Sequence, residues 1–228
     1  GDYLTRYINQ DISTNLTTVT SDIRSTSTLE HTLVLKDNCA ILSGTLSTPD
    51  TSGSNVVWIS KLSSYGGLDY HYPDITSYQD LSGFVGSTNY QRGAVLFHFD
   101  QSVGYHDLEQ QWDGGQILVV AVGHILYLIR LEQDGRENLS WGTDSGRTIF
   151  TSNYIVRWSK STIEQNGSIL MVGHTPDNFT ILYRFTRNGY PDTYFKTNNN
   201  DWYTIKTNST PLTSYIHDIK HDDINNFY

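Results

Sequence analysis

Short runs of β-branched, aliphatic and aromatic residues recur along the chain, and clusters of Gly, Asn, Asp and Ser separate them. Runs of this length and composition predict β-strands. The dipeptides Asp134-Gly135, Asn166-Gly167 and Asn188-Gly189 predict tight hairpin turns, because a type I′ turn needs positive φ at both central positions. Strands are predicted at Thr32–Leu35, Ala40–Gly44, Asn55–Leu62, Ala94–Phe99, Gln116–Val122, Ile125–Leu131, Tyr154–Trp158, Ser168–Val172, Thr180–Phe185 and Trp202–Thr207.

One segment has the pattern of a short helix rather than a strand. In Ser159–Gln165, Ser161 would be the capping residue and Glu164 would follow it three positions later. We therefore expect an all-β fold in which this segment is the one candidate for helix.

The chain also repeats itself. A basic residue inside an apolar run is followed by Gly five positions later, by Asp or Asn at eight and by an aromatic residue at eleven. One such hairpin cannot bury its apolar face alone, but several side by side can. The repeats predict a single domain over residues 1–228, built of antiparallel blades as a small β-propeller-like fold, with a lectin-like β-sandwich as the alternative. Full copies begin at Lys61, Arg130 and Arg184, and weaker ones at Arg6, His98 and Asp218.

Two resemblances to known families follow from these segments. Asp113–Val120 with Leu128–Gly135, and Gln165–Gly173 with Leu182–Phe195, resemble delta-60 repeats, which implies β-propeller blades over about residues 107–197. The order of features from Val119-Val120-Ala121 through Trp158 and Val172-Gly173 to Tyr215-Ile216 is similar to that in viral spike heads such as the rotavirus spike head, a galectin-like sandwich. Neither resemblance implies a catalytic residue.

Composition and charge narrow the function. The 228 residues include 16 Tyr and 5 Trp but only three Ala and five Glu, which argues against a helical bundle. The net charge of −9 argues against a nucleic-acid partner. The longest apolar run, Ile117–Leu131, is interrupted by Gly123, His124 and Arg130, so we expect no membrane insertion. Cys39 is the single cysteine, and the first 30 residues show no signal-peptide pattern.

Catalytic motifs are weak. Asp144–Phe150 resembles the Asp box of sialidase propellers but departs from it at Gly142 and Ile149, and such boxes stabilise turns in any case. The histidines of His217–Asp223 would lie about 13 Å apart along a strand, too far to share a metal ion. We therefore expect no enzyme activity and no cofactor. A glycan-cleaving enzyme and a structural surface-protein module remain the alternatives.

Aromatic residues in loops are the strongest candidates for binding, because sugars stack their C–H faces on Trp and Tyr rings. Trp58 and Trp158 lie inside predicted strands and are expected in the core, and Tyr105-His106-Asp107 is expected in a turn. The sequence thus predicts the receptor- or glycan-binding head of a viral or phage attachment protein, located on a virion or cell surface and able to form homo-oligomers through its parent protein. Its candidate contacts are Tyr105, His106, Trp112, Asp113, Asn200, Trp202 and Tyr203.

Overall fold

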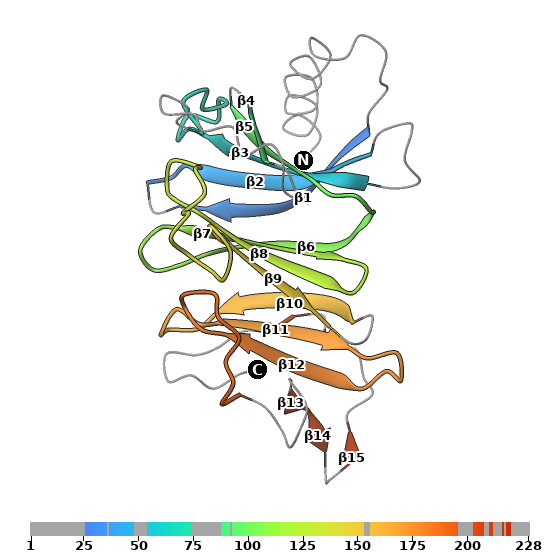
Figure 1. Ribbon diagram of the computed structural model, residues 1–228. Helices are drawn as coiled ribbons and strands as arrows, with labels where there is room; N and C mark the ends of the chain where they lie inside the picture. The colour runs from blue at the N-terminus through green and yellow to red at the C-terminus, as the bar shows by residue number, and fades with distance from the viewer. Residues whose placement is uncertain are drawn as a thin grey trace. The chain divides into compact units, whose positions relative to one another are not determined.

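The computed structural model describes residues 26–35, 37–47, 54–73, 88–91, 93–152, 156–195, 203–207, 210–211, 216 and 218–219. Every regular element among these residues is a β-strand (Figure 1). The strands are β1 (Thr26–Val34), β2 (Ala40–Ser47), β3 (Ser54–Leu62), β4 (Thr88–Gln91), β5 (Ala94–His98), β6 (Val103–Gln110), β7 (Gln116–Val122), β8 (Ile125–Leu131), β9 (Arg147–Thr151), β10 (Arg157–Ile163), β11 (Ile169–His174), β12 (Thr180–Phe185), β13 (Tyr203–Thr204), β14 (Lys206–Thr207) and β15 (Thr210–Pro211).

The strands form three antiparallel sheets of four or five strands and one two-stranded ribbon. The first sheet has the order β1-β2-β3-β5-β4, the second β6-β7-β8-β9 and the third β10-β11-β12-β13, and β14 pairs with β15. In the second and third sheets every strand pairs with the next in the chain, and none of the described sheets closes on itself. The all-β prediction is confirmed, and three predicted strands, β7, β8 and β12, have the predicted bounds.

The chain divides into two compact units. The first comprises the chain up to Val103 together with Asp134–Arg136, and the second comprises Gly104–Gln133 and the chain from Glu137 onward. No helix in the described part of the chain is long and apolar enough to cross a membrane. The prediction of one domain over residues 1–228 stays a prediction.

The three full repeat copies share one hydrogen-bonding pattern. The amide of the Asp or Asn at position eight donates to the carbonyl of the basic residue, over 2.8 Å at Lys61, 2.9 Å at Arg130 and 2.9 Å at Arg184. Its side-chain oxygen then accepts from the amide two residues later, at 3.0 Å in each copy. The glycine at position five has positive φ each time, so a residue with a Cβ would be strained there.

A second repeated turn precedes each copy. Asn166-Gly167 was predicted as a turn in one of these places, but the repetition was not predicted. In each of these turns the backbone amide of the first residue donates to the carbonyl of the fifth at 2.8 Å. The donor and acceptor are Leu35 and Cys39, Gln111 and Gly115, and Glu164 and Ser168. The fourth residue of each turn, Asn38, Gly114 or Gly167, has positive φ. Strand register then agrees in all three sheets, because the basic residue of each copy faces the second residue of the preceding strand.

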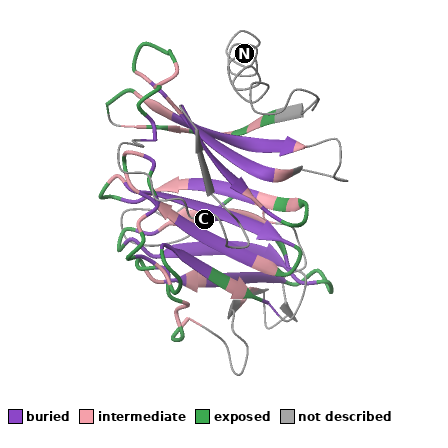
Figure 2. Cartoon of the chain, turned by 45° about the horizontal axis from the view of Figure 1, so that its top comes forward, coloured by how far each residue is buried: buried purple, intermediate pink, exposed green. Residues whose placement is uncertain are grey.

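The core of the second unit lies between the second and third sheets. Alternate residues of β7 and β8 on one side meet alternate residues of β11 and β12 on the other, as a period of two requires. Buried residues follow the strands, and exposed residues gather at the turns (Figure 2). This core contains Ile117, Val119, Ala121, Leu126, Leu128, Trp141, Ile169, Met171, Tyr183 and Phe185.

Two local predictions were wrong. The candidate helix Ser159–Gln165 is mostly strand β10, because the Ser161 amide and hydroxyl both donate to Asp107 on β6 instead of capping a helix. Tyr105-His106-Asp107 lies inside β6, not in a turn. Both errors have one cause, since a contact between distant segments decides the local conformation.

Candidate functional site

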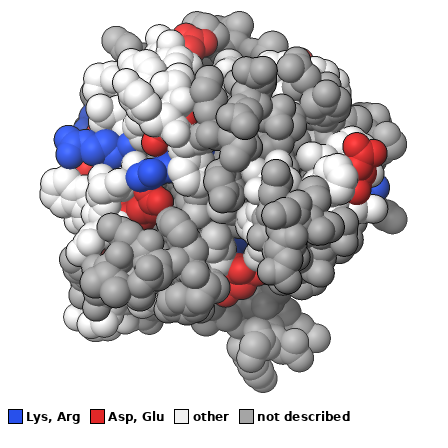
Figure 3. Space-filling model, turned by 90° about the horizontal axis from the view of Figure 1, so that it is seen from below, with Lys and Arg blue, Asp and Glu red and all other residues white. Residues whose placement is uncertain are grey.

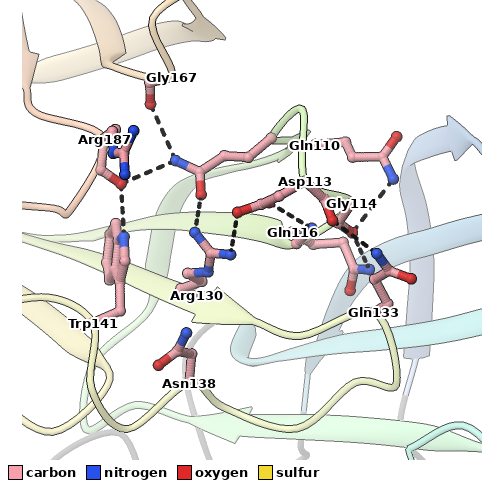
Figure 4. A network of polar contacts seen from close by, with 12 residues as sticks. Gln110, Asp113, Gly114, Gln116, Arg130, Gln133, Asn138, Trp141, Gly167 and Arg187 are labelled. Carbon is pink, nitrogen blue, oxygen red and sulfur yellow. Dashed lines mark hydrogen bonds and ion pairs between the residues drawn. The ribbon is translucent and has the colours of Figure 1, made fainter.

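Three turns of the second unit lie together at one end of its two sheets, and we call them the turn face: residues 111–115, 164–168 and 186–190. The Gln111 carboxamide connects them. Its Nε2 donates to the carbonyls of Gly167 and Arg187, each at 3.1 Å. Figure 4 labels these two acceptor residues. Gln111 is only 3% exposed. A buried amide with two backbone acceptors fixes the distance between the three turns.

The turn at 111–115 is fixed from its other side by Arg130 on β8. The guanidinium donates from Nη1 to Gln111 Oε1 and from Nη2 to Asp113 Oδ2, the latter at 2.7 Å. Asp113 Oδ1 accepts from the Gly115 amide at 3.1 Å, and its carbonyl accepts from Gln133 Nε2 at 2.7 Å. Partial burial opposes ionisation of Asp113, but the Arg130 and Gly115 donors outweigh it and lower the pKa. Asp113 is therefore an anionic anchor of the turn.

The turn at 186–190 is fixed in the same way. Trp141 Nε1 donates to the Arg187 carbonyl at 2.9 Å, the Gly142 amide to the Asn188 carbonyl at 3.1 Å, and Thr148 Oγ1 to the Gly189 carbonyl at 2.7 Å. Three consecutive carbonyls of this turn thus accept hydrogen bonds from residues 141–148, which belong to the β8–β9 connection and to the start of β9. The turn face has little backbone freedom to lose on binding a ligand.

Trp112 is the largest exposed side chain on this rigid surface. It is 69% exposed, although the neighbouring Gln111 is buried. A Cβ placed on Gly167 would lie 3.5 Å from Trp112 Nε1 and 3.1 Å from Arg187 Cβ, so these two side chains flank Gly167. Tyr190, which is 50% exposed, belongs to the same turn as Arg187. The surface therefore offers an aromatic ring beside a cation, a second aromatic side chain and turn backbone.

A second polar cluster lies inside the unit and connects β6 with β10. Asp107, 1% exposed, accepts at Oδ2 from Lys160 Nζ at 2.8 Å and from Tyr105 OH at 2.9 Å, besides the two Ser161 donors. Lys160 Nζ also lies 3.5 Å from Glu109 Oε1. With five donors counting the Leu108 amide, Asp107 holds the two strands together and has no capacity left for a ligand.

The titration of this cluster follows from burial and charge. Burial raises the pKa of Glu109 to about 7, and the charge of Asp107 acts in the same direction. Burial opposes the charged form of Lys160, but Asp107 and Glu109 outweigh it and raise the pKa. Burial, and then the Asp107 carboxylate, raise the pKa of the Tyr105 phenol.

The predicted contact residues have different positions. Trp112 is exposed on the turn face, and Asp113 beside it is paired with Arg130. Tyr105 is half-buried against the core, and His106 is 3% exposed. Tyr203 pairs through its backbone with Leu182, whereas Asn200 and Trp202 lie outside the described residues. Arg187 and Tyr190 were not predicted, because only the folded chain brings their turn beside Trp112.

The segment that resembles an Asp box forms a turn. Ser145 and Gly146 both have positive φ, and the amides and carbonyls of Asp144 and Arg147 pair across them. Arg147 is itself buried and donates to both carboxylate oxygens of Glu137, at 2.9 and 2.8 Å. This arginine therefore stabilises the fold of the turn. The histidine pair of His217–Asp223 lies outside the described residues.

Charged side chains on the described surface occur in small groups of both signs, as the face in Figure 3 shows. No family model matches this chain. Neither the search of curated proteins nor the search of solved structures finds a significant match. The resemblances to delta-60 repeats and to viral spike heads therefore stay predictions.

Proposed function

We propose that this chain is a non-enzymatic recognition domain that binds a glycan of a cell-surface receptor through its turn face. The scaffold is a β-propeller-like series of repeated sheets, and the parent is an attachment protein on a virion or phage surface. The repeated turns, the register shared by three sheets and the surplus of Tyr and Trp support this proposal. Homo-oligomers would form through the parent protein.

One observation carries the proposal: Trp112 is 69% exposed on a turn that buried hydrogen bonds hold in place. An exposed indole costs free energy in water, and a rigid one loses little entropy when a flat partner covers it. The C–H face of a sugar ring is such a partner. Turn carbonyls and amides around the ring are suited to the sugar hydroxyls.

The chemistry of the described charged groups favours binding over catalysis. Arg130, Arg147 and Arg184 each pair with a carboxylate of the protein, at 2.7, 2.8 and 2.6 Å. Asp107 and Glu137, which are nearly fully buried, are engaged in the same kind of pair. A glycosidase needs two carboxyl groups open to the substrate, and a sialidase needs arginines that are free to bind its carboxylate.

The test is a glycan array followed by calorimetric titration of the strongest ligand. Trp112→Ala should weaken binding at least tenfold without changing the free energy of unfolding, because the ring is mostly exposed. Tyr65→Ala is the matched control, since Tyr65 is 98% exposed but belongs to the other compact unit. An array without ligands, or equal effects of the two substitutions, would overturn the proposal.

A further inference from the structure

Arg187 differs from Arg130, Arg147 and Arg184 of the second unit. Its backbone carbonyl accepts hydrogen bonds from Gln111 and Trp141, but its exposed guanidinium forms no ion pair within the described residues. Arg130, Arg147 and Arg184, by contrast, each pair with a carboxylate. The chain as a whole has a net charge of −9, yet no hydrogen bond or ion pair among the described residues joins Arg187 to an acidic side chain.

The nearest acidic groups of the turn face are already neutralised. Asp113 lies 2.7 Å from the Arg130 guanidinium, and Glu164 lies 2.6 Å from that of Arg184. Neither carboxylate can compensate Arg187 without leaving its own partner. The charge of Arg187 is therefore directed to solvent, at the same turn contact where the Trp112 ring is exposed.

Resting on the proposed function, we infer that the glycan bound at the turn face carries an acidic group and that Arg187 binds this group. A guanidinium forms two parallel hydrogen bonds to a carboxylate or a sulfate, and its planar shape selects for that geometry. Trp112 would stack on the sugar ring while Arg187, whose Cβ lies beside Gly167 as the Trp112 indole does, holds the acidic substituent. The backbone of Arg187 is already fixed, so the contact requires ordering of the side chain alone.

The probes for the test are lactose, sulfated lactose and sialylated lactose, titrated calorimetrically against the whole chain. We expect the acidic probes to bind at least tenfold more tightly than lactose, and Arg187→Gln to remove that difference while leaving lactose affinity within about twofold. Arg187→Lys should restore part of the preference, because it keeps the charge but lacks the planar fork. Raising the salt concentration should weaken binding of the acidic probes alone. The acidic probe that binds more tightly shows whether Arg187 prefers a sulfate or a carboxylate.

The matched control is Arg136→Gln, because Arg136 is also exposed but pairs with Asp134 at 2.6 Å. Equal affinity for the neutral and acidic probes, or equal effects of Arg187→Gln and Arg136→Gln, would refute the role of Arg187. If Trp112→Ala still abolishes binding in that case, the glycan site stands and only the acidic preference fails. If Trp112→Ala has no effect, or no probe binds, the proposed function itself fails and the inference fails with it.

Discussion

Trp141 and Arg187 lie 46 residues apart in the chain, yet the Trp141 indole Nε1 donates a 2.9 Å hydrogen bond to the Arg187 carbonyl. The ring also packs on the neighbouring turn, because a Cβ on Gly189 would lie 2.6 Å from its Cη2 atom. Trp141 is the aromatic residue at position eleven of one repeat, and Gly189 is the glycine at position five of the next. In the first unit Tyr72 and Gly135 have the same two repeat positions, and a Cβ on Gly135 would lie 2.7 Å from the Tyr72 ring. The spacing of the repeat thus encodes how one turn packs on another.

Gly189→Ala should destabilise the protein by about 3 kcal/mol, because it adds strain at φ +84° to a clash with the Trp141 ring. Gly66→Ala is the control that separates the two causes. Gly66 has φ +81° but no atom within 4 Å of the added Cβ, so strain alone should cost about 1 kcal/mol. Urea unfolding measures both, and equal losses would show that the ring contact contributes nothing.

Gln111→Met should cost about 3 kcal/mol of unfolding free energy. The substitution keeps the volume but leaves the carbonyls of Gly167 and Arg187 and one Arg130 donor without this partner in a buried setting. Gln110→Met provides the comparison, since Gln110 is half-buried and makes a single 3.4 Å bond to the Gly114 carbonyl. A loss at Gln111 no larger than the loss at Gln110 would contradict the role given to this amide.

Glu109 should make stability fall as the pH rises. Its folded pKa of about 7 exceeds the ordinary value of 4.5, so the folded state binds more protons between these values, and this contribution is full below pH 4.5 and lost through pH 7. Asp107 and Asp218 oppose its ionisation, and Lys160 favours it. The shift allows at most about 3 kcal/mol, and we expect about 2 because the side chain is 22% exposed.

The measurement is urea unfolding of the wild type and Glu109→Gln from pH 4 to pH 8. The wild type should lose stability relative to the variant over this range, while Glu132→Gln, which alters a carboxyl outside the buried cluster, should run parallel to the wild type. Parallel profiles for Glu109→Gln and the wild type would show that Glu109 does not titrate in this window.

The buried pair of Arg147 and Glu137 should behave as one unit. Arg147→Met or Glu137→Gln alone should cost about 3–5 kcal/mol, because each leaves a buried group without its partner. The double variant should lose less than the sum of the two single losses, by about 1–3 kcal/mol. A double-mutant cycle by thermal unfolding tests this, and additive losses would mean that the two side chains do not interact.

The pattern of apolar residues and the residue types in the turns were sufficient to predict much of the fold. β7, β8 and β12 are mainly apolar runs bounded by turn residues, and their bounds could be read directly from the chain. The repeat turns could be located in the same way, because a glycine with positive φ and an Asp or Asn that accepts from the backbone two residues later are local requirements. These features need no distant partner. The predicted type I′ geometry at Asp134-Gly135, Asn166-Gly167 and Asn188-Gly189 was wrong, because only the glycine of each pair has positive φ.

β6 and β10 could not be predicted, because their local sequences are mixed and a distant contact decides them. Asp107 is polar enough to suggest a turn, yet Lys160 and Ser161 from β10 satisfy its carboxylate inside the protein. The candidate site likewise has one feature that the sequence predicted and one that it did not. The sequence by itself determined that Trp112 lies in a loop beside turn-forming residues. Only the tertiary structure decided that this loop meets the turn of Arg187, because buried hydrogen bonds from Gln111 and Trp141 join segments far apart in the chain.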